Sequence, residues 1–254
     1  MAERITLAII GGTGITELNG EAETLTVETP YGEPSSAIRV AHVGALRLLF
    51  LPRHGSPHRF PPHAVNYRAN MWALREAGAD HVLAVSAVGG IHPPYVPATL
   101  ALPDQLVDYS WGREHTYSDS GDVPLVHVDF TQPYRGPLRN ALLRASRRAS
   151  LEVIDGGCIG VFQGPRLESA AEIRRAAKDG CDLAGMTSLP EAGLARELGL
   201  DYAGIAVVSN WAAGVTDDAI SEDEIAAMLA EPMTRVRYLV DTLIEVLLED
   251  KTDD

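Results

Sequence analysis

Four short stretches of the sequence place glycine, proline and polar side chains directly after apolar runs. They read IIGGTG at residues 9–14, LPRHG at 51–55, VFQGPRLESAAEI at 161–173 and VVSNWAAG at 207–214. Open α/β sheets bind small ligands where their strands end, so these side chains are candidates for one site. The first stretch offers an anion backbone N–H groups and the Thr13 hydroxyl, and the second offers Arg53 and His54. Taken singly, each stretch also fits an ordinary turn after a strand.

Residues 53–63 carry three histidines, which raises the question of a metal. Their spacing matches no usual zinc-ligand pattern, and no cysteine lies among them. Three prolines, Pro57, Pro61 and Pro62, also keep this segment from forming a regular helix. A loop of anion donors is the better interpretation, and we expect no metal.

The segments that must position these residues alternate between strand and helix. Apolar runs predict strands at residues 6–10, 47–51, 81–88, 99–102, 158–162, 182–185 and 202–209. Helical patterns lie at residues 66–77, 137–149 and 190–198, after the break at Gly164-Pro165 with Glu168 near the start of the helix, and from Ser221 to about residue 248. This alternation predicts an α/β fold. Some connections are too short for a helical crossover, so we expect a mixed central sheet flanked by helices, in a single domain over residues 1–254.

Charge and hydropathy exclude several classes of function. The formal net charge is −14, which makes nucleic acid an unfavourable partner. No apolar run approaches the length of a membrane span, and residues 1–10 lack the basic start of a signal peptide. We therefore expect a cytoplasmic protein that contacts neither membrane nor nucleic acid.

Together the four stretches resemble the purine nucleoside phosphorylase and methylthioadenosine phosphorylase family, over about residues 7–246. The resemblance implies phosphorolysis: a purine nucleoside and inorganic phosphate give a free base and a pentose 1-phosphate, with phosphate as co-substrate and no cofactor. It also implies a homotrimer. The residues that match the family's phosphate-binding positions are Thr13, Arg53, His54, Ser86, Ala87 and Thr187, and Met186 matches a residue that packs against the ribose.

Two positions bear on the choice of base. Members of the family that act on adenine nucleosides carry aspartates in a T-D-x-D run after the last strand, and a serine where this chain has Glu168. Here the run reads Ser-Asn-Trp-Ala, which puts Asn210 and Ala212 at the aspartate positions. A carboxylate accepts the N1–H of hypoxanthine or guanine, and an amide N–H reaches O6 and N7, whereas adenine has no proton on N1. Glu168 and Asn210 are therefore the expected catalytic and base-binding pair for 6-oxopurines.

Different parts of the sequence resemble different branches of the family. NYRANMWALREAG and GMTSLPEAGLARE resemble the methylthioadenosine branch, while the base pocket resembles the 6-oxopurine branch. A methylthioinosine phosphorylase combines the two. At the sugar 5′ end, His127 matches a histidine that reaches a neighbouring subunit's pocket, and Glu222 falls where the methylthio branch has an apolar residue. Glu222 either accepts a hydrogen bond from a 5′-hydroxyl or only favours the helix dipole.

Two alternatives remain open at this stage. One is an S-methyl-5′-thioadenosine phosphorylase, and the other is a nucleoside-binding regulatory protein without catalysis. The second needs a nucleoside pocket but no phosphate-binding residues, so the joint presence of Thr13, Arg53, His54, Ser86 and Thr187 argues against it.

Overall fold

A computed structural model describes residues 5–12, 22–119, 123–218 and 221–251, apart from the side chain of Glu222. The chain forms one mixed sheet of eleven strands within these residues. The strands are β1 (Ile5–Gly11), β2 (Glu23–Leu25), β3 (Ile38–Val43), β4 (Leu46–Pro52), β5 (His81–Gly90), β6 (Leu100–Leu102), β7 (Gln105–Asp108), β8 (Ile154–Asp155), β9 (Cys158–Val161), β10 (Leu183–Gly185) and β11 (Asp201–Trp211). Their main path runs β2-β3-β4-β1-β5-β10-β9-β7, and β11 pairs with β5 and β6, which in turn pairs with β8.

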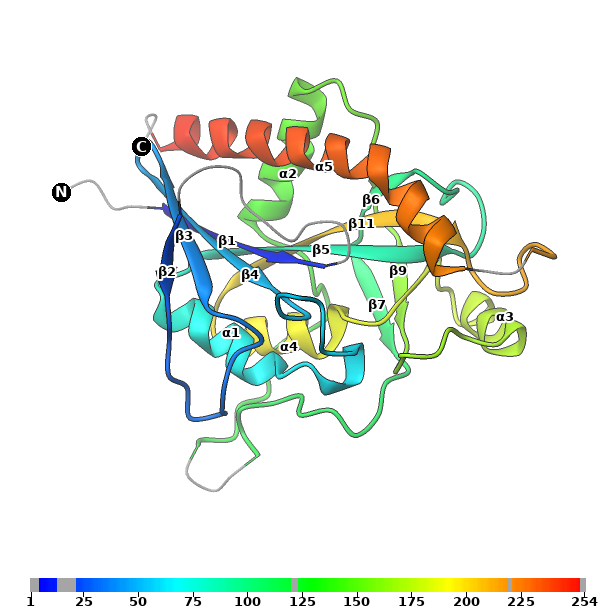
Figure 1. Ribbon diagram of the computed structural model, residues 1–254, viewed down its shortest axis with the longest axis horizontal. Helices are drawn as coiled ribbons and strands as arrows, with labels where there is room; N and C mark the ends of the chain where they lie inside the picture. Colours follow the sequence, from blue (N-terminus) through cyan, green and yellow to red (C-terminus); the bar gives the residue numbers. More distant parts are fainter. Residues whose placement is uncertain (1–4, 13–21, 120–122, 219–220, 252–254) are drawn as a thin grey trace.

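Helices cover both faces of this sheet (Figure 1). α2 (Pro137–Arg148) and α5 (Glu222–Asp250) lie on one face, and α1 (Tyr67–Glu76) and α4 (Ser188–Glu197) lie on the other. α3 (Ala170–Lys178) lies beside the β9 end of the sheet, and a short 3-10 helix spans Pro62–Ala64. Because both faces are covered, central strands such as β1 are apolar almost throughout.

The two largest of the four hydrophobic clusters in the described residues result from this layering. Alternate residues of the strands pack against α2 and α5 in the first core, which includes Leu83, Leu142 and Leu239. The residues between them pack against α1 and α4 in the second core, which includes Leu74 and Leu194.

The strand β5 changes its neighbour on one side, and this change creates a gap. β1 pairs with β5 only as far as Ala84, and β10 pairs with β5 only at Gly89 and Gly90. β11 accompanies β5 along the other side from His81 to Gly90. Within the described residues, the backbone of 85–88 therefore has a strand neighbour on one side alone. A cleft at such a switch point is where an α/β sheet binds its ligand.

The predicted fold class is confirmed, and the long strands and all five helices were expected from the sequence. The short strands β2, β7 and β8 were not predicted, since runs of two to four residues carry little pattern. β3 was also missed, although buried Ile38 and Val40 alternate with half-buried Arg39 and Ala41. The expected start of the last helix at Ser221 is confirmed: Ser221 caps α5, and its side chain accepts a hydrogen bond from the backbone N–H of Glu224.

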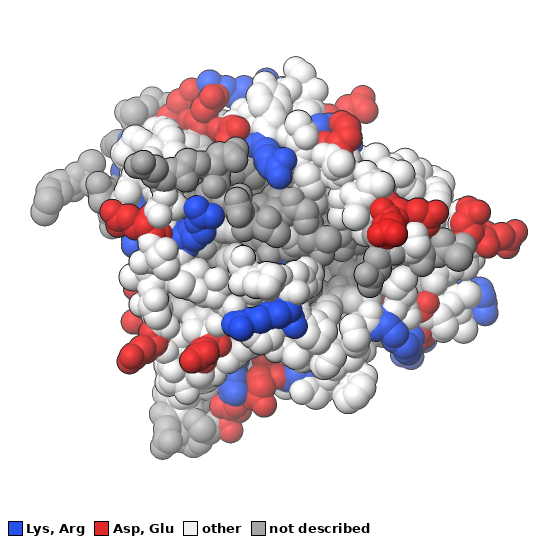
Figure 2. All heavy atoms as spheres, viewed as in Figure 1, with Lys and Arg blue, Asp and Glu red and all other residues white. Residues whose placement is uncertain are grey.

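The charges on the face shown in Figure 2 are scattered. Lysine and arginine side chains alternate with aspartate and glutamate, and those that the structure describes form no continuous basic stripe on this face. None of the helices in the described part of the chain has the length and apolar character needed to cross a bilayer.

Candidate active site

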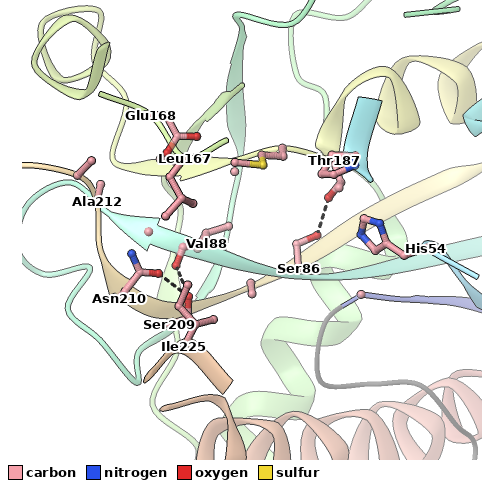
Figure 3. Close-up of a pocket in the computed structure, with 18 of the residues that line it drawn as sticks. His54, Ser86, Val88, Leu167, Glu168, Thr187, Ser209, Asn210, Ala212 and Ile225 are labelled. Atoms are coloured by element: carbon pink, nitrogen blue, oxygen red, sulfur yellow. Dashed lines mark hydrogen bonds between the residues drawn. The ribbon is translucent and has the colours of Figure 1, made fainter. Parts of the chain in front are cut away.

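A cavity of about 210 Å³ opens at the switch point of the sheet. Residues from the ends of β4 and β5, from the loop after β9, and from the ends of β10 and β11 line it (Figure 3). The lining includes these residues that the sequence analysis selected: Arg53, His54, Ser86, Ala87, Glu168, Met186, Thr187, Asn210 and Ala212. Segments far apart in the chain thus converge on one site. Figure 3 shows His54, Ser86 and Thr187 toward one end of it, and Glu168, Asn210 and Ala212 toward the other.

Three of the selected residues are not placed in the cavity. Thr13 lies outside the described residues, although its neighbour Gly12 lines the cavity. Glu222 is the first residue of α5, and its side chain lies outside the description. His127 is exposed and is not among the lining residues of its own chain.

Arg53 anchors the first end of the cavity, which we call the oxyanion end (Arg53, His54, Ser86 and Thr187). Its side chain is 1% exposed and forms a two-pronged ion pair with Glu191 of α4: Nε donates to Oε2 at 2.7 Å and Nη2 donates to Oε1 at 2.9 Å. Nη1 also donates to the Val85 carbonyl at 3.1 Å. A guanidinium has five N–H groups, so one on Nη1 and one on Nη2 remain available for a ligand.

The surroundings keep Arg53 charged and fixed. Burial lowers the pKa of Arg53, but the nearby Glu191 carboxylate raises it by a larger amount, so the net shift is upward. Tyr202 donates to Glu191 Oε1 at 2.9 Å and holds the carboxylate in turn. A Cβ at Gly12 would lie 2.9 Å from Arg53 Nη1 and 2.8 Å from the Val85 oxygen, so only glycine leaves room for this arrangement. Arg53 is therefore a positioned donor and not a mobile surface charge.

His54 adds a ring nitrogen at this end. Its Nδ1 lies 2.8 Å from the carbonyl oxygen of Phe60, and its ring stacks on His58 with 4.3 Å between ring centroids. Burial and the charge of Arg53 lower the pKa of His54 to about 4. The imidazole is therefore neutral at neutral pH.

Two hydroxyls complete the oxyanion end. Ser86 of β5 and Thr187, which follows β10, form a hydrogen bond with 3.2 Å between Oγ and Oγ1. One hydroxyl donates to the other, and the second proton stays available for a ligand. With Arg53, this end offers N–H and O–H donors from the residue after β4, from within β5 and from the segment after β10.

A bulge shapes the other end of the cavity, which we call the carboxylate–amide end (Glu168 and Asn210). β11 pairs Val208 with Val88 and then Asn210 with Gly89, so Ser209 is an extra residue in the ladder. Asn210 was expected just after the strand, but β11 continues to Trp211 because the ladder resumes after the bulge. The Ser209 hydroxyl donates to Asn210 Oδ1 at 2.7 Å, and Asn210 Nδ2 donates to the Trp211 carbonyl at 2.7 Å. One N–H of the amide remains for a ligand.

Glu168 stands on the loop between β9 and α3. It was expected near the start of the helix, but α3 begins at Ala170 because Ser169 and Glu172 form a capping box. Burial raises the pKa of Glu168, and the charge of Glu172 adds to the shift. Gly164 brings the loop inward at φ +61°, where a Cβ would lie 2.6 Å from Met186 Sδ. Ala212, across the cavity end, is 3% exposed and carries no polar group.

Other residues that support the site were not identified from the sequence. Arg113, in the irregular segment after β7, donates to the carbonyls of Phe162, Gln163, Met186 and Leu189 at 2.6–3.0 Å. It thereby ties the loop that carries Glu168 to the segment that carries Met186 and Thr187. The sequence shows Glu191 as an acidic residue within the helix that follows Thr187, but no sequence pattern predicts its ion pair with Arg53. His58, Leu167 and Ile225 also line the cavity.

No group of three or more histidine, cysteine or acidic residues suited to a metal ion occurs in the described ranges.

The fold and the site together define an α/β protein whose cavity carries N–H and O–H donors at one end and a carboxylate and an amide at the other. The chain belongs to the phosphorylase superfamily, whose sequence profile matches residues 6–245. It is 50% identical, over 90% of this chain and 98% of the relative, to a probable S-methyl-5′-thioinosine phosphorylase of Xylella fastidiosa (strain 9a5c). A 6-oxopurine nucleoside phosphorylase of Pyrococcus furiosus is 39% identical over 96% of this chain and 94% of its own. Among solved structures, the methylthioadenosine phosphorylase of Schistosoma mansoni in complex with adenine superposes with a TM-score of 0.88 at 30% identity, over 96% of this chain and 92% of that one.

Proposed function

We propose that this protein is an enzyme that cleaves 6-oxopurine nucleosides with inorganic phosphate. The substrates are inosine, guanosine or S-methyl-5′-thioinosine, and the products are a free purine and ribose 1-phosphate or its methylthio analogue. One observation carries the proposal: a carboxylate and an amide, Glu168 and Asn210, meet at one end of a cavity whose other end holds oxyanion donors (Figure 3). The names of the relatives from Xylella and Pyrococcus agree with it.

The two ends suit the two halves of the reaction. As the bond between the sugar C1′ and the purine N9 lengthens, positive charge develops on the sugar and negative charge on the base. Phosphate held by Arg53, His54, Ser86, Ala87 and Thr187 attacks C1′ from the face opposite the base, and its own charge stabilises the sugar cation. Preorganised charges and donors of this kind commonly supply the largest share of catalysis. The reaction needs no cofactor and no metal, since phosphate itself is the second substrate.

Base selection follows from hydrogen-bond polarity. The Glu168 carboxylate accepts the N1–H of a 6-oxopurine, and the free N–H of Asn210 is directed to O6 or N7. Adenine would face Glu168 with an unprotonated N1, and a buried mismatch of this sort costs about 1–3 kcal/mol. Ala212 supplies no carboxylate that would accept the amino group of adenine.

A phosphorylase of S-methyl-5′-thioadenosine is the second candidate, because the Schistosoma enzyme that this chain resembles is named for that substrate. A panel of inosine, guanosine, S-methyl-5′-thioinosine, adenosine and S-methyl-5′-thioadenosine, assayed with and without phosphate, separates the candidates. We expect phosphate-dependent release of hypoxanthine or guanine and little release of adenine. Faster cleavage of methylthioadenosine than of methylthioinosine would reverse the assignment of the base, and binding without phosphate-dependent cleavage would indicate a regulatory protein.

The same proposal includes a cytosolic homotrimer with a composite site. His127 is exposed and follows two exposed apolar residues, Leu125 at 71% and Val126 at 56% exposed, and such a patch favours contact with another subunit. In the proposed trimer, His127 reaches the sugar 5′ end of a neighbour's site, close to Glu222.

Complementation tests the composite site. If His127 and Glu168 serve one site from two chains, His127→Ala and Glu168→Gln should each lose activity. Subunit exchange between the two variants should then restore some sites that carry both native residues. No recovery despite proven exchange would contradict the composite site, and light scattering from a fully active monomer would contradict the trimer.

A further inference from the structure

His54 presents a hydrogen-bond acceptor at an end of the cavity that otherwise presents donors. Its Nδ1 lies 2.8 Å from the Phe60 carbonyl oxygen, and a carbonyl can only accept a hydrogen bond. The ring proton must therefore be on Nδ1. In a neutral imidazole with its proton on Nδ1, the other nitrogen, Nε2, is an acceptor.

The environment keeps Nε2 unprotonated and free. Burial and the adjacent Arg53 charge disfavour a second proton, with the pKa of His54 near 4, and the stacked His58 ring also disfavours it. Among the residues that the structure describes, Nε2 has no hydrogen-bond partner, and the His54 side chain lines the cavity. The residue is 8% exposed, so bulk water has little access to it. The acceptor is left for the ligand.

We propose that His54 accepts a hydrogen bond from a protonated oxygen of the bound tetrahedral anion, so that the site selects phosphate and arsenate over sulfate and selenate. The inference rests on the proposed function and adds the chemical rule by which the co-substrate is chosen. The hydrogen phosphate dianion keeps one P–O–H group, and sulfate has the same charge and shape but no proton. The free N–H groups of Arg53 and the free hydroxyl proton of the Ser86–Thr187 pair can serve either anion, whereas His54 distinguishes them. A sulfate oxygen carries no proton, so its lone pairs would repel the lone pair of Nε2.

The phosphate complex has a buried hydrogen bond from its P–O–H group to Nε2 of His54, and the sulfate complex has an unsatisfied contact at the same place. The expected selectivity is the free-energy difference between the two. This corresponds to roughly 5- to 150-fold weaker binding of sulfate than of phosphate. No proton is transferred in this step, and His54 remains neutral before and after the anion binds.

Calorimetric titration of the wild-type protein with matched anions tests the rule at a slightly alkaline pH. Phosphate is compared with sulfate, and arsenate with selenate, because the members of each pair are nearly equal in size. We expect phosphate and arsenate to bind at least several-fold more tightly than their partners, and sulfate to be a correspondingly weak competitor of phosphate in the phosphorolysis assay. Equal binding within the pairs, in an enzyme that does catalyse phosphorolysis, would overturn this inference alone. Absence of phosphorolysis with every nucleoside would overturn the proposed function instead.

Variants assign the selectivity to His54. In His54→Gln the side-chain amide can turn an N–H toward the anion, so the affinity ratio of phosphate to sulfate should fall toward one. Ser86→Ala is the matched control: it removes a donor that serves both anions, so both should bind more weakly and the ratio should stay high. An unchanged ratio in folded His54→Gln would contradict the role of His54.

Nitrogen NMR of the wild-type protein gives a measurement that needs no variant. Histidine labelled with ¹⁵N should show Nδ1 protonated and Nε2 unprotonated at neutral pH, and phosphate should shift the Nε2 resonance while sulfate leaves it nearly unchanged. A proton found on Nε2 in the free protein would overturn the proposal.

Discussion

The two ends of the cavity are built in different ways. At the oxyanion end, Arg53 and Glu191 are each 1% exposed and are joined inside the core, between the sheet and α4. At the carboxylate–amide end, Glu168 stands on a loop and Asn210 follows a bulge, and both are only partly buried. The first end is part of the folded core, and the second is attached to its rim.

Because of this difference, we expect substitutions at the two ends to have different consequences for the stability of the fold. A change at the oxyanion end disturbs buried charges, so it affects stability together with anion binding. A change at the carboxylate–amide end affects which base is accepted and leaves the core intact. Each prediction below tests whether the two ends separate in this way.

The largest effect is expected from Arg53→Met. It removes the main donor that we propose for phosphate and leaves Glu191 buried without its cation. Breaking a buried ion pair in this way destabilises a protein by about 3–5 kcal/mol. Loss of a principal oxyanion donor lowers kcat by roughly 10²–10³-fold. The measurements are the urea midpoint, the apparent KM for phosphate, and kcat, with a smaller change expected in affinity for the nucleoside.

A double variant separates the two consequences of that change. Arg53→Met with Glu191→Leu removes both charges, and replacing a buried pair by apolar residues is often neutral for stability. We expect the urea midpoint to recover while phosphate kinetics stay impaired. If phosphate kinetics also recover, Arg53 acts on the fold alone and not on the anion.

Glu168→Gln should have the next largest effect, and only at the carboxylate–amide end. An amide can turn an N–H toward the N1–H of the base, so kcat/KM for the 6-oxopurine nucleoside should fall about 5- to 150-fold. Stability and the phosphate KM should stay close to wild type. A large loss of stability would instead show that Glu168 supports the fold.

The pH dependence of the wild type sharpens this prediction. Burial raises the pKa of Glu168, so as pH falls the carboxylate is lost at a higher pH than in an ordinary glutamate, whose pKa is about 4.3. The acid limb of kcat/KM for the nucleoside should therefore lie above that value. This limb should be absent from Glu168→Gln. An unchanged limb in the variant would assign it to another group.

Asn210→Asp should change the choice of base by a smaller amount. The new carboxylate keeps the hydrogen bond from Ser209 but cannot donate to the Trp211 carbonyl, nor to O6 or N7. We expect about tenfold lower kcat/KM on inosine-type substrates, the value of one lost hydrogen bond. The ratio of adenine to hypoxanthine nucleoside cleavage should rise. A uniform loss on both would mean that Asn210 positions the substrate without reading its base.

Nine of the residues selected from the sequence line the cavity, and several of them directly follow apolar runs. Arg53, Ser86 and Thr187 each follow an apolar run, and in an α/β sheet such ends meet at one edge. The boundary of α3 was less predictable, because the capping box at Ser169 competes with a helical pattern that extends to Glu168.

The supporting residues could not be predicted, because their partners are distant in sequence. Glu191 lies 138 residues from Arg53, and the packing of α4 against α1 and β11 brings the two side chains together. Arg113 lies in a segment without periodicity, so nothing local indicated that it would join two loops. The bulge at Ser209 depends on the ladder with β5, which no single strand reveals.

Ser209→Ala should give the smallest effect, and it isolates the orientation of Asn210. The hydroxyl donates to Asn210 Oδ1 at 2.7 Å, which leaves Nδ2 as the group that can donate to the base. Without it the amide can rotate and present its oxygen, so kcat/KM for the nucleoside should fall about 2- to 12-fold, the range for one neutral hydrogen bond. Phosphate kinetics should barely change, and the urea midpoint should change little, because the only other contact of the hydroxyl among the described residues is a long one, 3.3 Å from the Val88 carbonyl oxygen. Ser209→Thr keeps the hydroxyl and should retain wild-type base preference. If both variants lose activity equally, the size of the side chain at the bulge matters and the hydrogen bond does not.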